Sequence, residues 1–344
     1  MTTREFVMLA LLASALCVAF LASLAIGSSA IPMARTVDAL IGGGTPGDRA
    51  IVTAVRLPRA VTAILAGAAL GIAGLQMQTL FRNPLADPFA LGVSSGASLG
   101  VAVVVLGAGT AAADMFGSST GLVGDALVTA AAVAGAAAVL ALVLAVSSRI
   151  ADATAILILG LMFGYGVSAC VTVLVGASAP ERLQQWAQWG LGSFAGVTWP
   201  RLRIFAPITL VGLAIAALTP KQLNALLLGE RYARSMGLSV VRARVLTMSG
   251  ASVLAAVVTA FCGPISFIGI AVPHLCRGLL GTADHRSVVP AVVLMGAVIA
   301  LTAQIVSVLP GNGAVLPLNA VTALLGAPTV VFILLRGRRN GAAA

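Results

Sequence analysis

Five charged residues gather in one short stretch of a chain that is otherwise poor in charge. They are Glu230, Arg231, Arg234, Arg242 and Arg244, whereas Asp, Glu, Lys and Arg together make up only 9% of the 344 residues. One carboxylate among four guanidinium groups can form ion pairs and multi-donor contacts with another protein. A second interpretation is equally open at this point: the arginines only hold a loop on the cytoplasmic side of a membrane.

Groups for catalysis or cofactor binding are scarce. The single lysine, Lys221, is not part of a GxxxxGK[ST] sequence, so a phosphate-binding loop of that type is excluded. Two histidines, His274 and His285, cannot form a metal-binding cluster, and the four cysteines have no metal-ligand spacing. We expect the cysteines to be buried thiols, and we expect no metal, no cofactor and no catalytic residue.

The ten carboxylates all fall in predicted loops or at the ends of predicted helices. Carriers driven by ion gradients keep ionisable groups inside the membrane, and the middle of each apolar run here has none. A secondary carrier or channel is therefore the weaker alternative, and a membrane-embedded enzyme is weaker still. A transport protein of this composition needs its energy from another chain.

The composition is that of a polytopic membrane protein. Hydrophobic residues make up 60% of the chain, and the mean hydropathy is +1.08. This hydrophobic share exceeds that of soluble domains. The net charge of +10 comes from basic residues between apolar runs, as in cytoplasmic loops. Aromatic residues make up 5%, which leaves little for base stacking, so nucleic acid is not an expected partner.

Ten apolar runs approach the roughly 20 residues that a helix needs to cross a bilayer. They cover about residues 6–28, 59–81, 91–110, 121–147, 153–176, 200–219, 243–263, 265–280, 287–309 and 318–335. The first run is longer than the core of a signal peptide, so we expect a retained helix, with a cleaved signal peptide as the lesser alternative. These runs predict an all-α bundle of about ten transmembrane helices in a single domain, residues 1–344.

Ten spans place both termini on one side of the membrane. If that side is the cytoplasm, thirteen of the 20 Lys and Arg residues lie inside, as the positive-inside rule favours. The segment 221–240 is then cytoplasmic. Residues 221–236 follow Pro220 and predict a short helix, with Gly237 as a left-handed cap.

Five stretches follow one another in an order that covers nearly the whole chain. They are "RLPRAVTAILAGAALGIAGLQMQTLFRNPLADPFALGVSSGASLG" (56–100), "GLGSFAGVTW" (190–199), "LLLGERYARSMGL" (226–238), "GPISFIGIAVPHLCRGLLGTADHR" (263–286) and "VTALLGAP" (321–328). In sequence, order and number of spans the chain resembles the permease subunits of ABC importers for iron-siderophores, haem and cobalamin (FecCD-type, type II importers).

The resemblance implies that residues 226–238 form the coupling element that fits a cleft on the ATPase subunit. Its site residues would be Gly229, Glu230, Arg231, Arg234 and Gly237. Arg56 and Arg59 match positions that dock the substrate-binding protein, although arginines at a membrane interface also snorkel to water.

The resemblance also implies an inner gate. Its residues would be Asn83 and Leu85 in "RNPLADP", with Ala153 and Thr154 in the weaker match "IADATA". Four positions depart from the family pattern: Gln304, Val308, Val315 and Asn319. They suggest that one outer docking contact is missing or replaced, and hint at a heterodimer of two different permeases.

The function that follows is that of an ABC importer permease in the cytoplasmic (cell inner) membrane, with both termini inside and no enzymatic activity of its own. Expected partners are two ATPase subunits, a second permease subunit (the same or different), a periplasmic or lipid-anchored substrate-binding protein and the lipid bilayer. The first substrate expected is an iron(III)-siderophore, and haem and cobalamin are the alternatives.

Overall fold

The computed structural model describes residues 2–27, 31–107, 122–147, 149–150, 152–309 and 315–341. Within these residues all regular secondary structure is helical, which confirms the all-α prediction. Seven of the described helices are long and apolar enough to cross a membrane, and three shorter apolar helices accompany them. These ten helices coincide with the ten predicted runs.

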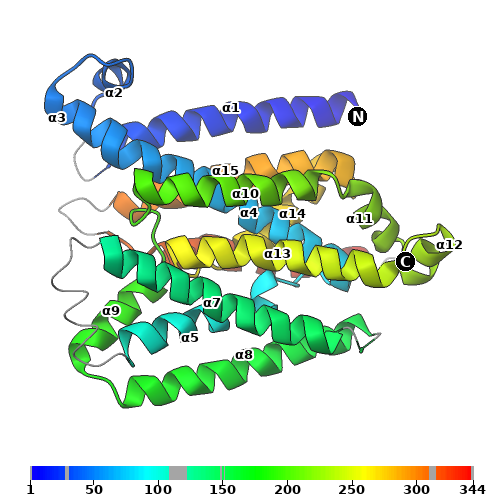
Figure 1. Cartoon of the computed structure of the whole chain (residues 1–344). Helices are drawn as coiled ribbons and strands as arrows, with labels where there is room; N and C mark the ends of the chain where they lie inside the picture. The colour runs from blue at the N-terminus through cyan, green and yellow to red at the C-terminus, as the bar shows by residue number, and fades with distance from the viewer. Residues whose placement is uncertain are drawn as a thin grey trace. The chain divides into compact units, whose positions relative to one another are not determined.

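The first of two compact units consists of Met1–Leu75, Ser193–Ala206 and Ile265–Ala344. It contains α1 (Thr3–Ala25), α2 (Met33–Leu40), α3 (Pro46–Arg49), the π-helix η1 (Ala50–Arg56), most of α4 (Leu57–Phe81), the start of α10 (Trp199–Ala217), α14 (Ile268–Leu280), α15 (His285–Val308) and α16 (Leu318–Gly341). Helix α1 packs against α15, and α14 packs against both α15 and α16 (Figure 1).

Small residues allow close helix packing in this unit. A Cβ atom added to Gly67 of α4 would lie 2.2 Å from the carbonyl oxygen of Gly296 in α15, so no larger residue fits without a shift of the backbone. Helix α4 is buried along most of its length, whereas α1 exposes most of its apolar surface. In a membrane protein such an exposed apolar surface suits contact with lipid or with another transmembrane chain.

The second unit consists of Gln76–Gly192 and Pro207–Pro264. It contains the end of α4, the 3-10 helix η2 (Pro88–Leu91), α5 (Val93–Val105), α7 (Leu122–Ser147), α8 (Ala153–Gly176), α9 (Pro180–Gly190), the rest of α10, α11 (Pro220–Leu227), α12 (Glu230–Ser235) and α13 (Val240–Cys262). Helix α5 lies beside α7 and α8, and α7 also contacts α13 (Figure 1).

Three features differ from the sequence-based expectations. Helices α2, α3 and α9 are short or amphipathic, so the search for apolar runs did not predict them. The single helix predicted over residues 221–236 is two helices. Cys262 and Cys276 are buried as expected, but Cys17 and Cys170 are exposed because they lie on outward faces of α1 and α8.

Candidate coupling surface and gate segments

The segment predicted to couple to an ATPase forms two short helices joined at a glycine. Helix α11 ends at Leu227, and α12 begins after Gly229, whose φ of +106° belongs to a conformation that favours glycine. Helix α12 ends before Gly237, which has φ +81° as the predicted cap requires. Two glycines therefore give α12 defined ends within a segment of about the predicted length.

Helix α12 presents a mixed apolar and cationic surface. Arg231, Arg234 and Tyr232 are exposed, and so is Leu228 before the helix. Together with Arg82 these residues line a hollow of about 530 Å3, which we call the α12 surface. A concave surface with guanidinium groups and exposed apolar side chains suits a contact with another protein.

Glu230 makes its ion pairs inside the chain. Its carboxylate lies 3.5 Å from the guanidinium of Arg234, one turn along α12, and also pairs with Arg244 of α13. The side chain of Arg244 is buried, whereas that of Glu230 is half-buried. Of the three predicted polar contact residues, Arg231 and Arg234 are thus exposed at the α12 surface, whereas Glu230 also lines the hollow but is held in ion pairs within the chain.

The first predicted gate segment, residues 82–88, forms a compact turn that leads from α4 to the start of η2. Arg82 has a positive φ of 48°, and the Asn83 side-chain oxygen accepts a hydrogen bond of 2.9 Å from the backbone N–H of Leu85. This bond closes an Asx turn. Leu85 is 42% exposed, so the structure places a fixed asparagine and an exposed leucine where the gate was predicted.

A buried carboxylate follows this turn. The Asp87 side chain accepts a hydrogen bond of 2.8 Å from the N–H of Phe89 and so caps η2. Burial raises the pKa of Asp87 to about 6, and the hydrogen bond from Phe89 opposes that shift. From the sequence, Asp87 was expected in a loop and had no predicted role.

The second predicted gate segment, residues 150–155, leads into α8, which begins at Ala153. Asp152 caps α8 through a hydrogen bond of 3.0 Å from the N–H of Thr154, and Thr154 is exposed. The side chain of Ala153, like residue 151, lies outside the described part of the chain. The carbonyl oxygen of Ile150 accepts a hydrogen bond of 3.1 Å from Arg244.

The second unit thus connects four elements: the two predicted gate segments, α12 and α13. Arg82 at the first predicted gate segment lines the α12 surface, and Arg244 of α13 joins α12 to the second predicted gate segment. From the sequence, Arg244 was predicted only as part of a charged stretch. The signal that could have predicted an internal ion pair was an arginine within an apolar run, with one carboxylate nearby in the chain.

The two arginines predicted to dock a binding protein differ in burial. Arg56 is 6% exposed, and its guanidinium donates hydrogen bonds of 2.8 Å and 2.7 Å to the carbonyl oxygens of Leu24 and Ala25. These carbonyls end α1 and have no partner within that helix. Arg56 therefore ties the end of α1 to the start of α4.

Arg59 lies beside it, in a polar cavity of about 200 Å3 in the first unit. Among the described residues, its buried Nε and the Oε1 of Gln304 in the same cavity lack hydrogen-bond partners. Val308 also lines the cavity, and Val315 is exposed. Asn319, another departure from the family pattern, accepts a hydrogen bond of 3.1 Å from the N–H of Ser266.

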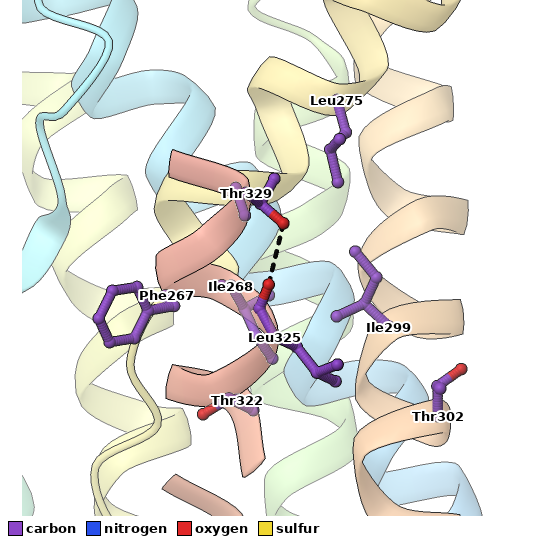
Figure 2. A pocket seen from close by; sticks show the side chains of 10 residues that line it. Phe267, Ile268, Leu275, Ile299, Thr302, Thr322, Leu325 and Thr329 are labelled. Atoms are coloured by element: carbon purple, nitrogen blue, oxygen red, sulfur yellow. Dashed lines mark hydrogen bonds between the residues drawn. The ribbon is translucent and has the colours of Figure 1, made fainter. Parts of the chain in front are cut away.

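A further cavity of about 230 Å3 lies among α14, α15 and α16 (Figure 2). Its lining is mainly apolar, with Phe267, Leu275 and Ile299 among the side chains. The hydroxyls of its three threonines donate to carbonyls of their own helices, as Figure 2 shows for Thr329 and Leu325 at 2.9 Å. This cavity offers an apolar surface and no evident polar binding group.

A family profile, the FecCD transport family, matches residues 15–336. The chain belongs to this family. It is 38% identical over 288 residues to the vitamin B12 import system permease protein BtuC of Klebsiella pneumoniae, covering 83% of each chain. It is 37% identical over 296 residues to BtuC of Escherichia coli O9:H4, covering 86% of each.

A solved structure has a similar fold over nearly the whole chain. It is described as an inward-facing conformation of a metal-chelate type ABC transporter, and the match has a TM-score of 0.80 at 27% identity. The match covers 96% of this chain and 99% of that chain. The chain is therefore an ABC importer permease of the FecCD family, a multi-pass protein of the inner membrane.

As a permease it is a membrane subunit and not an enzyme, because ATP is hydrolysed by a separate subunit. It works together with an ATPase and a substrate-binding protein. The resemblance described from sequence is confirmed.

Proposed function

We propose that this permease carries a metal chelate across the inner membrane, driven by an ATPase that docks on the α12 surface. The observation that carries the proposal is the arrangement within the second unit. The α12 surface is exposed, and the two predicted gate segments are attached to it through Arg82 and Arg244. A movement imposed on α12 from outside would act on both segments.

The mechanism we propose is a shift between two packings of the bundle. ATP binding closes a pair of ATPase subunits, the closure displaces α12, and the displacement favours one state of the gate over the other. Asn83, Leu85, Ala153 and Thr154 are the proposed gate residues. The permease contributes differential contacts in the two states and forms no covalent bond with the substrate.

Two substrates are candidates within the class of metal chelates. The names of the relatives that are 36–38% identical favour cobalamin. The resemblance to the wider family favours an iron(III)-siderophore, which was the first expectation from sequence, and haem belongs to the same class.

On the outer side we propose that Arg59 docks a carboxylate of the substrate-binding protein. Its Nε has no partner among the described residues, and Gln304 beside it provides a further polar group. With Gln304 and Val308 in place of charged residues, the docking surface of this chain carries fewer charges than the family pattern. We therefore propose a heterodimer in which the second permease supplies them. Both termini are proposed to be cytoplasmic, and residues 1–344 to form one permease domain.

Uptake by cells tests the substrate class. A strain that lacks its own chelate permeases would express this chain with its ATPase and binding protein, and would receive cobalt-labelled cobalamin or iron-labelled siderophore. We expect accumulation of one chelate, and loss of that accumulation when the ATPase gene carries a mutation in its catalytic glutamate. Accumulation of neither chelate nor haem would overturn the proposed substrate class.

A further inference from the structure

Arg244 is a buried cation in an otherwise apolar part of the chain. It lies in the second turn of α13 and is 5% exposed. Burial of a guanidinium is unfavourable unless its charge and its N–H groups are paired. Its partners are therefore informative about why an arginine stands at this position.

These partners belong to two segments that are distant in the sequence. One guanidinium nitrogen donates to a carboxylate oxygen of Glu230, the first residue of α12. The other donates to the carbonyl oxygen of Ile150 at 3.1 Å, in the second predicted gate segment. Arg244 is thus bonded at the same time to the element that would contact the ATPase and to the segment that would line the gate.

The planar shape of the group matters for this connection. A guanidinium presents several donors in a fixed plane, so two partners on different sides are held at a set separation. A lysine ammonium at the same position is a compact charge on a flexible stem and cannot hold both partners in one geometry. Glu230 also pairs with the exposed Arg234, so the connection continues to the α12 surface.

We propose that Arg244 is a positioning residue that transmits the movement of α12 to the second predicted gate segment. The inference rests on the proposed function, because it presumes that an ATPase displaces α12. A residue needed only for folding would act on stability and on abundance in the membrane. A transmitting residue acts on the response of the second predicted gate segment to nucleotide, and this difference can be measured.

The experiment uses the assembled permease–ATPase complex in lipid nanodiscs, with Cys17 and Cys170 replaced by serine and alanine because both are exposed. One exposed reporter cysteine is introduced, either Ser235→Cys in α12 or Arg149→Cys directly before the second predicted gate segment, while the buried Cys262 and Cys276 are kept. The rate at which the reporter cysteine reacts with a water-soluble maleimide is measured before and after vanadate traps nucleotide in the ATPase. Each reporter is combined with Arg244→Met, Arg244→Lys, or Arg242→Met as the control, since Arg242 is exposed on the same helix.

In the parent chain and in Arg242→Met we expect trapping to change the labelling rate at both reporters by about threefold or more. In Arg244→Met the change at Ser235 persists, and the change at Arg149 is lost. Arg244→Lys keeps the positive charge, and we expect it to reduce the change in labelling rate at Arg149 without abolishing it. This variant still tests the inference if Arg244→Met does not assemble. ATP hydrolysis continues in both variants while substrate transported per ATP falls.

Two results overturn the inference alone: an unchanged response at Arg149 in both Arg244 variants, or no response at Arg149 in the parent. A different result overturns the proposed function and the inference together. It is failure of the ATPase to co-purify with the parent chain, or absence of any nucleotide response at Ser235.

Discussion

At the scale of residues, burial separates side chains that look equivalent in the sequence. Arg56 and Arg59 lie close together in the same motif, and the sequence suggested one role for both. In the structure Arg56 donates hydrogen bonds to the carbonyl oxygens that end α1, whereas the Nε of Arg59 has no hydrogen-bond partner among the described residues. The residue types were predictable from sequence, but their partners were not, because Leu24 and Ala25 meet Arg56 only when α1 and α4 pack.

This difference predicts opposite phenotypes for two single substitutions. Arg56→Met removes charge-assisted hydrogen bonds from buried carbonyls, which costs about 2 kcal/mol, and should lower the thermal midpoint of the purified permease. Arg59→Met should leave the midpoint nearly unchanged and weaken binding of the substrate-binding protein by about tenfold. For each variant we would measure the thermal midpoint and the affinity of the substrate-binding protein for the permease in nanodiscs. Equal stabilities and equal affinities would contradict both assignments.

A second prediction concerns the pH dependence that Asp87 gives to stability. Its pKa is about 6 in the fold, against 3.8 for an ordinary aspartate, so the folded state holds the proton more tightly than the unfolded state. The stabilisation from its protonated form is complete below about pH 4 and is lost as the pH rises through about 6. As Asp87 loses its proton over this pH range, the free energy of unfolding falls by about 3 kcal/mol at most.

Asp87→Asn keeps a side-chain oxygen for the N–H of Phe89 and removes the buried charge. We expect a higher thermal midpoint than the parent at pH 8 and little difference at pH 4.5. The control is Asp152→Asn at the cap of α8, which makes the same substitution at an exposed carboxylate. A midpoint gain for Asp87→Asn that is the same at pH 4.5 and pH 8 would argue against a titrating buried carboxylate.

At the scale of elements, the ten apolar runs were predictable because length and hydropathy are properties of the local sequence. For example, the run predicted at 153–176 has the bounds of α8. The break in the predicted helix 221–236 was harder to locate, because Gly229 is as compatible with a helix interior as with a turn until its φ is known. The hydrogen bond between Arg244 of α13 and Ile150 was not predictable, since these residues are 94 positions apart in the chain.

The shape of α12 should matter more than its charge. Gly237→Val places a β-branched residue at φ +81°, and Gly229→Val does so at +106°, so both should distort the ends of α12. Each cationic residue is retained, so topology and insertion should be unchanged. We expect ATPase recovered with a tagged permease to fall about tenfold or more. The measurement pairs this recovery with permease abundance in membranes.

Arg231→Lys with Arg234→Lys provides the complementary test, because positive charge is kept and planar multi-donor contacts are lost. We expect normal insertion, with ATPase recovery reduced by about threefold to tenfold. Arg242→Lys is the matched control on α13. Full recovery and full uptake in the double variant and in both glycine variants would leave these arginines with a topological role only.

At the scale of the whole molecule, the central claim is that transport by this chain is driven by an ATPase and not by an ion gradient. The family assignment supports it. The placement of carboxylates agrees with it, since Asp87 and Asp152 cap helices and Glu230 is paired at the start of α12. The decisive measurement is uptake of the labelled chelate into proteoliposomes that contain the permease, its ATPase and the binding protein.

In these vesicles we expect uptake to require ATP on the α12 side and to stop when vanadate is added. We expect no change in uptake when ionophores abolish proton and sodium gradients. Uptake that continues without the ATPase subunit and depends on an imposed proton or sodium gradient would contradict the account.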